Sequence, residues 1–192
     1  MVDQKALLHL MVSLSSYASL STGFATALSP LVNCRSLKKG RVLVEVGRKE
    51  QLVWFLHAGT VKEVTAIQEQ GTERVSWFWF PSDFIFYYPG FFAREPSASR
   101  IELVEDSLVL EIAYRDFISL VEKFSEVPLL IEKIRSRYEN QRVSHSASLT
   151  TLNAKQRYLK FYQAHKNIFN VVKHKDIASF LGIKNDGFRR YH

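Results

Sequence analysis

Four glycines divide residues 40–71 of the chain, which read GRVLVEVGRKEQLVWFLHAGTVKEVTAIQEQG. The segments between them, from Val42, Val53 and Val61 onward, are short and rich in β-branched and aromatic residues, a composition typical of β-strands separated by turns. Further strands are predicted at 74–80, 99–104 and 107–112. Short strands at a spacing of about ten residues favour an antiparallel sandwich or roll.

Helical patterns lie on both sides of these strands. Residues 4–12 and 16–32 have apolar residues at three- and four-residue spacing, which predicts two short helices. Residues 128–148 and 154–165 predict two further helices, the first of them long. Its apolar stripe packs either on its own domain or on a partner helix. The stripe consists of Ile131, Ile134, Tyr138 and Gln141.

The charge of the chain is concentrated in its last third. The formal net charge is +7, yet residues 1–125 have a net charge of −1 and residues 126–192 a net charge of +8. Such asymmetry indicates a polyanion-binding module attached to a neutral one, or else a solvated basic surface. The hydrophobic share of 46% and the charged share of 23% are those of an ordinary globular protein.

Several classes of protein are excluded by composition. Cys34 is the only cysteine, so a disulfide framework, a zinc ribbon and a four-thiolate iron–sulfur site within one subunit are ruled out, and a reducing, cytoplasmic location is predicted. A run of about 18 apolar residues is absent, which argues against a membrane span. We find no local catalytic signature and predict no enzyme, no metal and no cofactor. Haem ligation by His9 or His57 is disfavoured, since an isolated histidine is more often a packed or surface residue.

The C-terminal residues 174–192 read HKDIASFLGIKNDGFRRYH and fit the frame of a helix-turn-helix. Ala178 stands where two crossing helices leave no room for a large side chain. Gly182 stands where the tight turn requires a positive φ. The frame also requires five buried apolar residues, which are here Ile177, Leu181, Ile183, Phe188 and Tyr191.

Residues on the outward face of the second helix suggest DNA as the partner. Arginine, lysine and asparagine bond phosphates or base edges, and aspartate accepts from cytosine. A structural or protein-binding unit would not need two adjacent arginines on this face. Gly187 lowers the helix propensity by about 1 kcal/mol relative to alanine. The predicted DNA-binding residues are Lys175, Lys184, Asn185, Asp186, Arg189 and Arg190.

The order of these parts resembles the Crp/Fnr family of bacterial transcription regulators. The resemblance rests on KKGRVLVEVG, FLHAGTVKEV, PSDFIF and PSASRIELVEDSLVLEI in the strand region and on AKQRYLKFY and KDIASFLGI in the tail. It implies an α+β fold, in which an antiparallel β-roll of the jelly-roll type precedes a long dimerisation helix and a helix-turn-helix. The implied domains are a sensor at 1–115, a connecting and dimerisation helix at 116–149 and a DNA-binding domain at 150–192.

The family's phosphate-binding cassette is degenerate in this sequence. Where the family has Gly-Glu and Arg, the matching positions are Phe86, Tyr87 and Ser97, so the resemblance does not extend to cyclic AMP binding. Arg94 and Arg100 are the alternative counter-charges for a phosphate, at the wrong spacing. A buried phosphate without a counter-charge is unfavourable by several kcal/mol. The candidate effector-pocket residues are Phe86, Tyr87, Ser97, Ala98, Ser99 and Arg100.

Residues 77–92, WFWFPSDFIFYYPGFF, contain 10 of the chain's 25 aromatic residues. Two interpretations remain open. The rings either fill the former nucleotide pocket as core, or form a pocket for an unknown effector that is flatter or more apolar.

The resemblance also implies how DNA would be read. Asn185, Asp186 and Arg190 occupy the family's base-contacting positions, where Arg, Glu and Arg are common, while Lys175, Lys184 and Arg189 are candidates for phosphate contacts. We expect a homodimer paired through helix 128–148 on half-sites about 10 base pairs apart.

Overall fold

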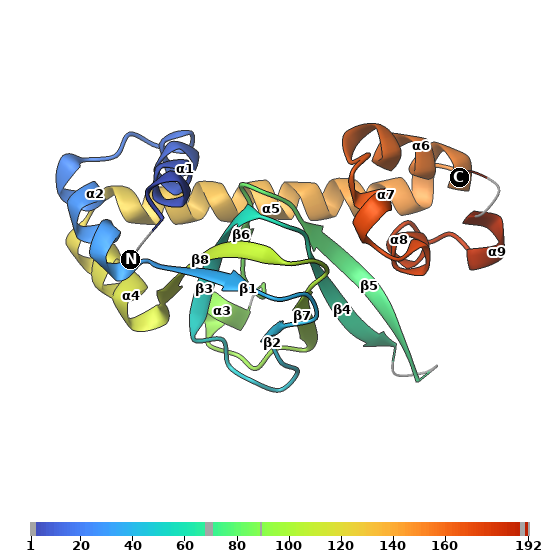
Figure 1. The fold of residues 1–192 in the computed structure, drawn as a ribbon, viewed down its shortest axis with the longest axis horizontal. Coiled ribbons are helices and arrows are strands. Elements are labelled where there is room, and N and C mark those ends of the chain that lie inside the picture. Colours follow the sequence, from blue (N-terminus) through green and yellow to red (C-terminus); the bar gives the residue numbers. More distant parts are fainter. Residues whose placement is uncertain (1–2, 68–70, 89, 189–190, 192) are drawn as a thin grey trace.

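The computed structural model describes residues 3–67, 71–88, 90–188 and 191. A β-roll occupies the middle of the molecule, helices cap one end, and a long helix, α5, leads to a helical group at the other end (Figure 1). The described strands are β1 (Asn33–Leu37), β2 (Val42–Val44), β3 (Leu52–Ala58), β4 (Val61–Ile67), β5 (Thr72–Trp79), β6 (Phe84–Ile85), β7 (Ser99–Leu103) and β8 (Ser107–Ala113). The helices before α5 are α1 (Gln4–Ser15), α2 (Thr22–Leu28), the 3-10 turn η1 (Ser29–Leu31), α3 (Gly90–Ala93) and α4 (Tyr114–Lys123). From α5 onward they are α5 (Glu126–Thr151), α6 (Ala154–Ala164), α7 (Ile168–Val171), α8 (His174–Phe180) and α9 (Asn185–Phe188).

The roll consists of two antiparallel sheets with the strand orders β1-β8-β3-β6 and β2-β7-β4-β5. Successive side chains of a strand point to opposite faces of its sheet. In β7, Ser99, Ile101 and Leu103 are buried, whereas Arg100 and Glu102 between them are partly exposed. The turn from β3 to β4 requires Gly59, which has φ +112° and where a Cβ would overlap the Ser107 side chain.

The N-terminal helices cover the first of these sheets. The Asp3 carboxylate accepts hydrogen bonds from the backbone N–H groups of Lys5 and Ala6, at 2.8 and 3.2 Å, and so begins α1. Leu10 and Leu14 on the inner face of α1 then pack into a core with residues of the sheet and of the first turns of α5. This core joins the N-terminal helices to the roll.

Helix α5 packs along the whole length of the roll. Its Val127 and Leu130 are buried in the N-terminal core, and Tyr138 is buried among the aromatic rings of the roll. The Arg142 guanidinium forms an ion pair with the buried Glu63 of β4. Of the two alternatives for the apolar stripe of this helix, the structure shows packing on its own domain, at least as far as Tyr138.

The C-terminal helices pack together around aromatic side chains. Helix α6 begins with a capping box, in which Asn153 accepts from the Gln156 backbone N–H and the Gln156 side chain accepts from that of Asn153. Phe161 of α6 and Phe180 of α8 meet at 5.3 Å, and Phe180 lies 5.1 Å from Phe78 of β5. The aromatic core is therefore continuous from the roll into the C-terminal helices.

The predicted α+β roll followed by helices is confirmed. The helix predicted at 128–148 begins at Glu126 and ends at Thr151, and the one predicted at 16–32 is shorter, since only Thr22–Leu28 is α-helical. The strands β1 and β6 were not expected. Among the described residues, no helix is both long and apolar enough to cross a membrane.

Candidate nucleic-acid interface and sensor interior

Helices α8 and α9 are joined by a tight turn at Gly182. Its φ is +61°, and a Cβ built there would lie 3.3 Å from the Leu149 side chain, so glycine suits both the turn and the close packing. Ala178 is buried as expected at the helix crossing. Of the five apolar positions expected inside, four are buried and Tyr191 is half-buried; the four are Ile177, Leu181, Ile183 and Phe188.

Arg157 of α6 donates hydrogen bonds to the backbone of this turn. Its Nε donates to the Leu181 carbonyl at 2.7 Å and its Nη2 to the Gly182 carbonyl at 3.0 Å. Its Nη1 donates to the carbonyls of Leu152 at 2.5 Å and Leu149 at 3.3 Å, where α5 ends. One guanidinium therefore satisfies carbonyl groups at the ends of two helices that have no intrahelical partner there. The residue lies in the AKQRYLKFY motif, but the motif alone did not reveal this role.

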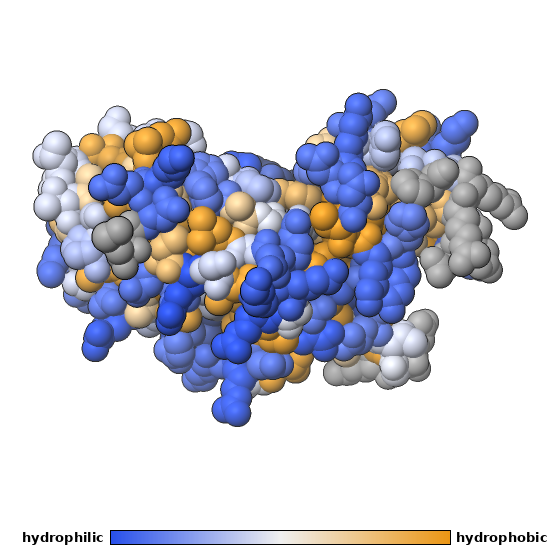
Figure 2. Space-filling model, viewed as in Figure 1, coloured by the Kyte–Doolittle hydropathy of each residue, from blue (hydrophilic) through white to orange (hydrophobic). Residues whose placement is uncertain are grey.

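Four of the six predicted DNA-binding residues lie on or next to α8 and α9. The side chains of Lys175 and Lys184 are exposed to solvent. Asn185 and Asp186 form the first turn of α9. Arg189 and Arg190 lie outside the described residues. The side chain of Lys184 is thus accessible beside the turn and that of Lys175 at the start of α8, and Figure 2 shows that most of the visible surface of the molecule is hydrophilic.

Helix α8 is attached to the roll by polar contacts across its inner side. The Lys62 ammonium on β4 lies 2.8 Å from the Asp176 carboxylate of α8 and 3.0 Å from Glu102 of β7. Burial alone would lower the pKa of Lys62, but hydrogen bonds to these two carboxylates outweigh it and raise the pKa. The Ser179 hydroxyl accepts a hydrogen bond of 3.1 Å from the Val75 backbone N–H. The position of α8 is therefore set by the β4–β5 hairpin.

The candidate effector-pocket residues do not converge on one space. Phe86 is buried, and its ring lies 5.2 Å from that of Tyr138. The buried Ser97 donates to the Ser99 carbonyl at 2.6 Å. Ala98 is exposed and Tyr87 is half-buried. These side chains thus point into the core, into a backbone turn or towards solvent.

Both arginines considered as counter-charges for a phosphate are bound elsewhere. Arg100 forms ion pairs with Glu73 and Glu102, each at 2.9 Å, on the outer face of β7. Arg94 donates to the Glu50 carbonyl at 2.6 Å, and its guanidinium lies 3.8 Å above the Tyr114 ring. Neither guanidinium is free to neutralise an anion inside the roll.

Aromatic rings pack closely around Tyr138 in the roll. Trp79 is stacked on Tyr138 with centroids 6.3 Å apart, and Trp77 meets it edge-on at 5.7 Å. Burial raises the pKa of the Tyr138 hydroxyl. These contacts favour core packing as the role of the first residues of the aromatic segment 77–92.

Glu50 is a buried carboxyl that sequence reasoning did not single out. Its Oε2 accepts the Tyr87 backbone N–H at 2.9 Å, and among the described residues its Oε1 has no hydrogen-bond partner. Burial raises the pKa of Glu50 to about 8, although the Tyr87 hydrogen bond and the charge of Arg94 act to lower it. The carboxyl is therefore mostly protonated at pH 7.

The two histidines considered as haem ligands contact each other. The Nδ1 atoms of His9 and His57 are 2.9 Å apart, and the His9 Nε2 lies 2.8 Å from the Ser82 hydroxyl. Burial and the proximity of His57 lower the pKa of His9. Within the described part of the chain, no cluster of three or more His, Cys, Asp or Glu side chains could hold a metal ion.

Residues 34–124 match the cyclic nucleotide-binding domain family, and this match covers the roll and helix α4. Among solved structures, FixK2 from Bradyrhizobium japonicum has a TM-score of 0.72 at 15% identity, over 83% of this chain and 82% of that one. The global regulator CLP of Xanthomonas campestris, described as responsive to c-di-GMP, has a TM-score of 0.68 at 12% identity, over 89% of each chain. A protein from Eubacterium rectale described as a Crp/Fnr-family regulator has a TM-score of 0.71 at 15% identity, over 90% of this chain and 82% of that one.

Residues 34–124 are therefore similar to the cyclic nucleotide-binding domain family, and the fold of the chain matches solved structures that include a global regulator and a protein described as a Crp/Fnr-family regulator. At these identities, the solved structures establish the fold alone. No curated protein matches the sequence.

Proposed function

We propose that the protein is a cytoplasmic, sequence-specific DNA-binding transcription regulator of the Crp/Fnr type and not an enzyme. The observation that carries the proposal is the α8–α9 unit, in which apolar residues are buried around Gly182 while Lys175 and Lys184 remain exposed. In this reading, residues 1–115 form the sensor, 116–149 the connecting and dimerisation helix, and 150–192 the DNA-binding domain.

The dimer would form through α5, on the side that does not face the roll. Leu129 and Val143 are 49% and 68% exposed, although both are large apolar residues. They lie fourteen residues apart with Ser136 midway, which is the seven-residue spacing of a helix–helix seam. Two copies paired there would present their recognition helices to successive major grooves, at half-sites about 10 base pairs apart.

The sensor would not respond to cyclic AMP. Its cassette lacks the arginine that pairs with the cyclic phosphate, and Arg94 and Arg100 are bound to other groups. Titration calorimetry with cyclic AMP should give no isotherm at micromolar concentration. A measurable isotherm in that range would contradict this part of the proposal.

Selection from a randomised duplex pool, with purified protein and no added ligand, tests the proposal directly. We expect a palindromic site, since a symmetric dimer reads two equivalent half-sites.

Val143→Asp should give a monomer that loses at least ten-fold in affinity for the selected site, because a charge then faces the seam. The control is Val46→Asp, since Val46 is a similarly exposed valine on the roll, at 60%. If the selection enriches no sequence, sequence-specific DNA binding is refuted. If the Val143→Asp protein is still a dimer, the dimer contact through Leu129 and Val143 is refuted.

A further inference from the structure

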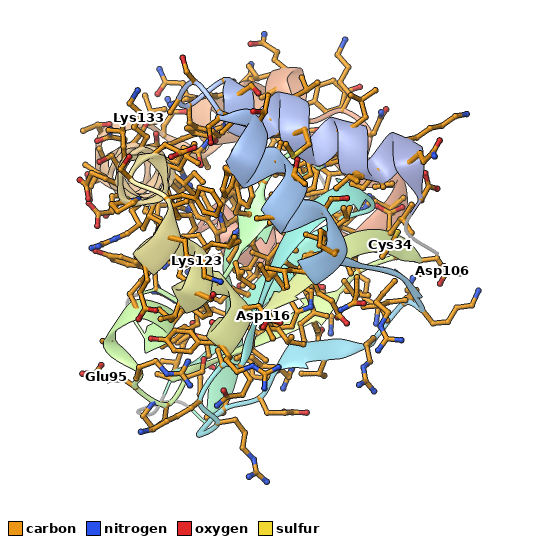
Figure 3. The ribbon with its side chains drawn as sticks, turned by 90° about the vertical axis from the view of Figure 1, so that its left-hand side faces the viewer. Cys34, Glu95, Asp106, Asp116, Lys123 and Lys133 are labelled. Carbon is orange, nitrogen blue, oxygen red and sulfur yellow. The ribbon has the colours of Figure 1, made fainter. Side chains whose placement is uncertain are left out.

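An apolar cavity of about 110 Å³ lies between the N-terminal helices, the roll and the first turns of α5. Figure 3 shows this end of the molecule, with α4 carrying Asp116 and Lys123 in front and the near end of α5 carrying Lys133. The cavity belongs to the sensor, but most of its wall lies outside the phosphate cassette. It is bounded by α1, α2, β3, β8, α4 and α5 together.

The wall of the cavity is formed almost entirely by carbon. Phe24 of α2, Phe55 of β3 and Phe117 of α4 contribute rings, and Leu130 and Ile134 contribute aliphatic side chains from α5. Glu111 is the only charged residue of the wall, and its carboxylate forms an ion pair of 3.0 Å with Arg35 on β1. A molecule in the cavity would therefore find shape and dispersion contacts but no hydrogen-bonding partner among these side chains.

The segment between α1 and α2 is fastened to α5 by polar contacts. The Ser21 hydroxyl donates to Glu126 at 2.6 Å, the Lys133 ammonium to the Tyr17 carbonyl at 2.6 Å, and Arg137 to the Tyr17 hydroxyl at 2.7 Å. These bonds are exposed to solvent, so breaking them costs less than disrupting the core.

We propose that this cavity is the effector site of the sensor and that it takes a small neutral hydrocarbon, of the class of benzene and toluene. An apolar cavity of comparable size, roughly 150 Å³, stays dry and binds benzene or xenon in another protein. A charged or hydrogen-bonding molecule would lose its hydration without compensation. The effector role rests on the proposed DNA-binding function, whereas ligand binding itself does not.

A packed series of side chains connects the cavity with the C-terminal helices. Ile134 lines the cavity, and Tyr138 follows one turn later on α5. Tyr138 contacts Trp77 at 5.7 Å, and Trp77 contacts Phe180 of α8 at 6.1 Å. A ligand that fits one position of α5 better than another would therefore shift the position of α8 as well.

Thermal unfolding with toluene as the probe tests the binding step. At ten times its dissociation constant, a ligand should raise the midpoint of a chain of this size by about 3–6 °C. Leu130→Phe fills the cavity and should abolish this rise. Leu8→Phe, on the exposed side of α1 and outside the cavity wall, should leave it intact. Benzoate, the charged analogue, should give no rise in the wild-type protein.

A second cavity-filling variant and a measurement of DNA affinity complete the test. If Leu130→Phe does not fold, Leu120→Phe fills the same cavity from α4 and takes its place. Affinity for the selected DNA site, with and without toluene, should differ at least three-fold in wild type and not in the filled variant. No rise with toluene, or an equal rise in the filled variant, would overturn the site. A rise with unchanged DNA affinity would overturn the effector role, and failure to select any DNA would refute the proposed function alone.

Discussion

The Asp176 carboxylate of α8 lies 2.8 Å from the ammonium group of Lys62 on β4, although the two residues are 114 positions apart in the sequence. Both side chains are largely shielded, with 15% of Lys62 and 14% of Asp176 exposed. The pair therefore links the roll to the C-terminal helices in a place where water screens it weakly.

We expect this pair to contribute measurably to stability. Lys62→Met and Asp176→Asn, combined in a double-mutant cycle, should give a coupling free energy of about 1–2 kcal/mol in urea unfolding. The matched control is the ion pair of Lys38 and Asp106, at 2.7 Å but with 87% and 58% of the side chains exposed. That pair should give a smaller coupling free energy, because solvent screens it. Equal coupling in both cycles would show that burial does not strengthen the contact.

Gly182→Ala should destabilise the protein by about 1–2 kcal/mol, because alanine is strained at φ +61°. The added methyl would also press on Leu149. Gly187→Ala provides the control. Its Cβ would meet Ile183 at an ordinary 3.8 Å, and alanine favours the helix by up to about 1 kcal/mol. Thermal unfolding of both variants measures the difference. A loss of stability at Gly187 equal to that at Gly182 would argue against this geometry of the turn.

The stability of the protein should fall as the pH rises from 7 to 8. Because the pKa of Glu50 is raised to about 8, the folded protein keeps a proton that the unfolded chain has already lost above its ordinary pKa of 4.5. This contribution is complete below that ordinary value and is lost as the pH approaches 8. Between pH 7 and 8, Glu50 by itself should decrease the free energy of unfolding by about 1 kcal/mol.

Glu50→Gln should flatten this dependence, since glutamine carries no titrating proton but can still accept the Tyr87 N–H. Burial lowers the pKa of His9, His145 and His165 below 6.5, so near pH 7 the unfolded chain binds more protons at these residues than the folded protein does. The histidines therefore oppose the effect of Glu50 towards pH 7, but they do so equally in the wild type and in the variant. Urea unfolding at pH 7 and 8 makes the comparison, and an unchanged slope in the variant would contradict the assignment to Glu50.

The two classes of DNA contact should be separable by mutation. Arg190→Ala should cost about 1–3 kcal/mol on the selected site and relax the preference at one base pair. Lys184→Ala should weaken binding to all sequences and reduce the slope of affinity against salt. Fluorescence anisotropy on specific and random duplexes at several salt concentrations distinguishes the two. Equal losses from Arg190→Ala on both duplexes would count against a base contact.

Local patterns predicted the roll and the helices well, and the reasons for the exceptions are physical. Strand β1, NCRSL, has no alternation of apolar and polar residues, and it exists because β8 provides its backbone partners. The two residues of β6 lie within an aromatic run in which no period is visible.

The candidate site was predicted less completely. The buried positions of α8 and the turn at Gly182 follow from a fixed spacing of residues. The contacts of Arg157 and of Lys62 join segments far apart in the chain, so no local pattern contains them. Arg94 and Arg100 were considered as alternative counter-charges for a phosphate, at the wrong spacing, and only the tertiary structure shows which partners hold them.

The four hydrogen bonds of Arg157 have a mechanical consequence. Because a single guanidinium joins the last carbonyls of α5 to those of α8, the C-terminal helices are fastened to α5 as a rigid attachment and not on a free hinge. A rotation of α5 about its own axis would therefore carry the α8–α9 unit along an arc around that axis and would break the contacts of α8 with Lys62 and Val75. Small angular changes near the roll would become large displacements at the tip that is proposed to enter the DNA groove.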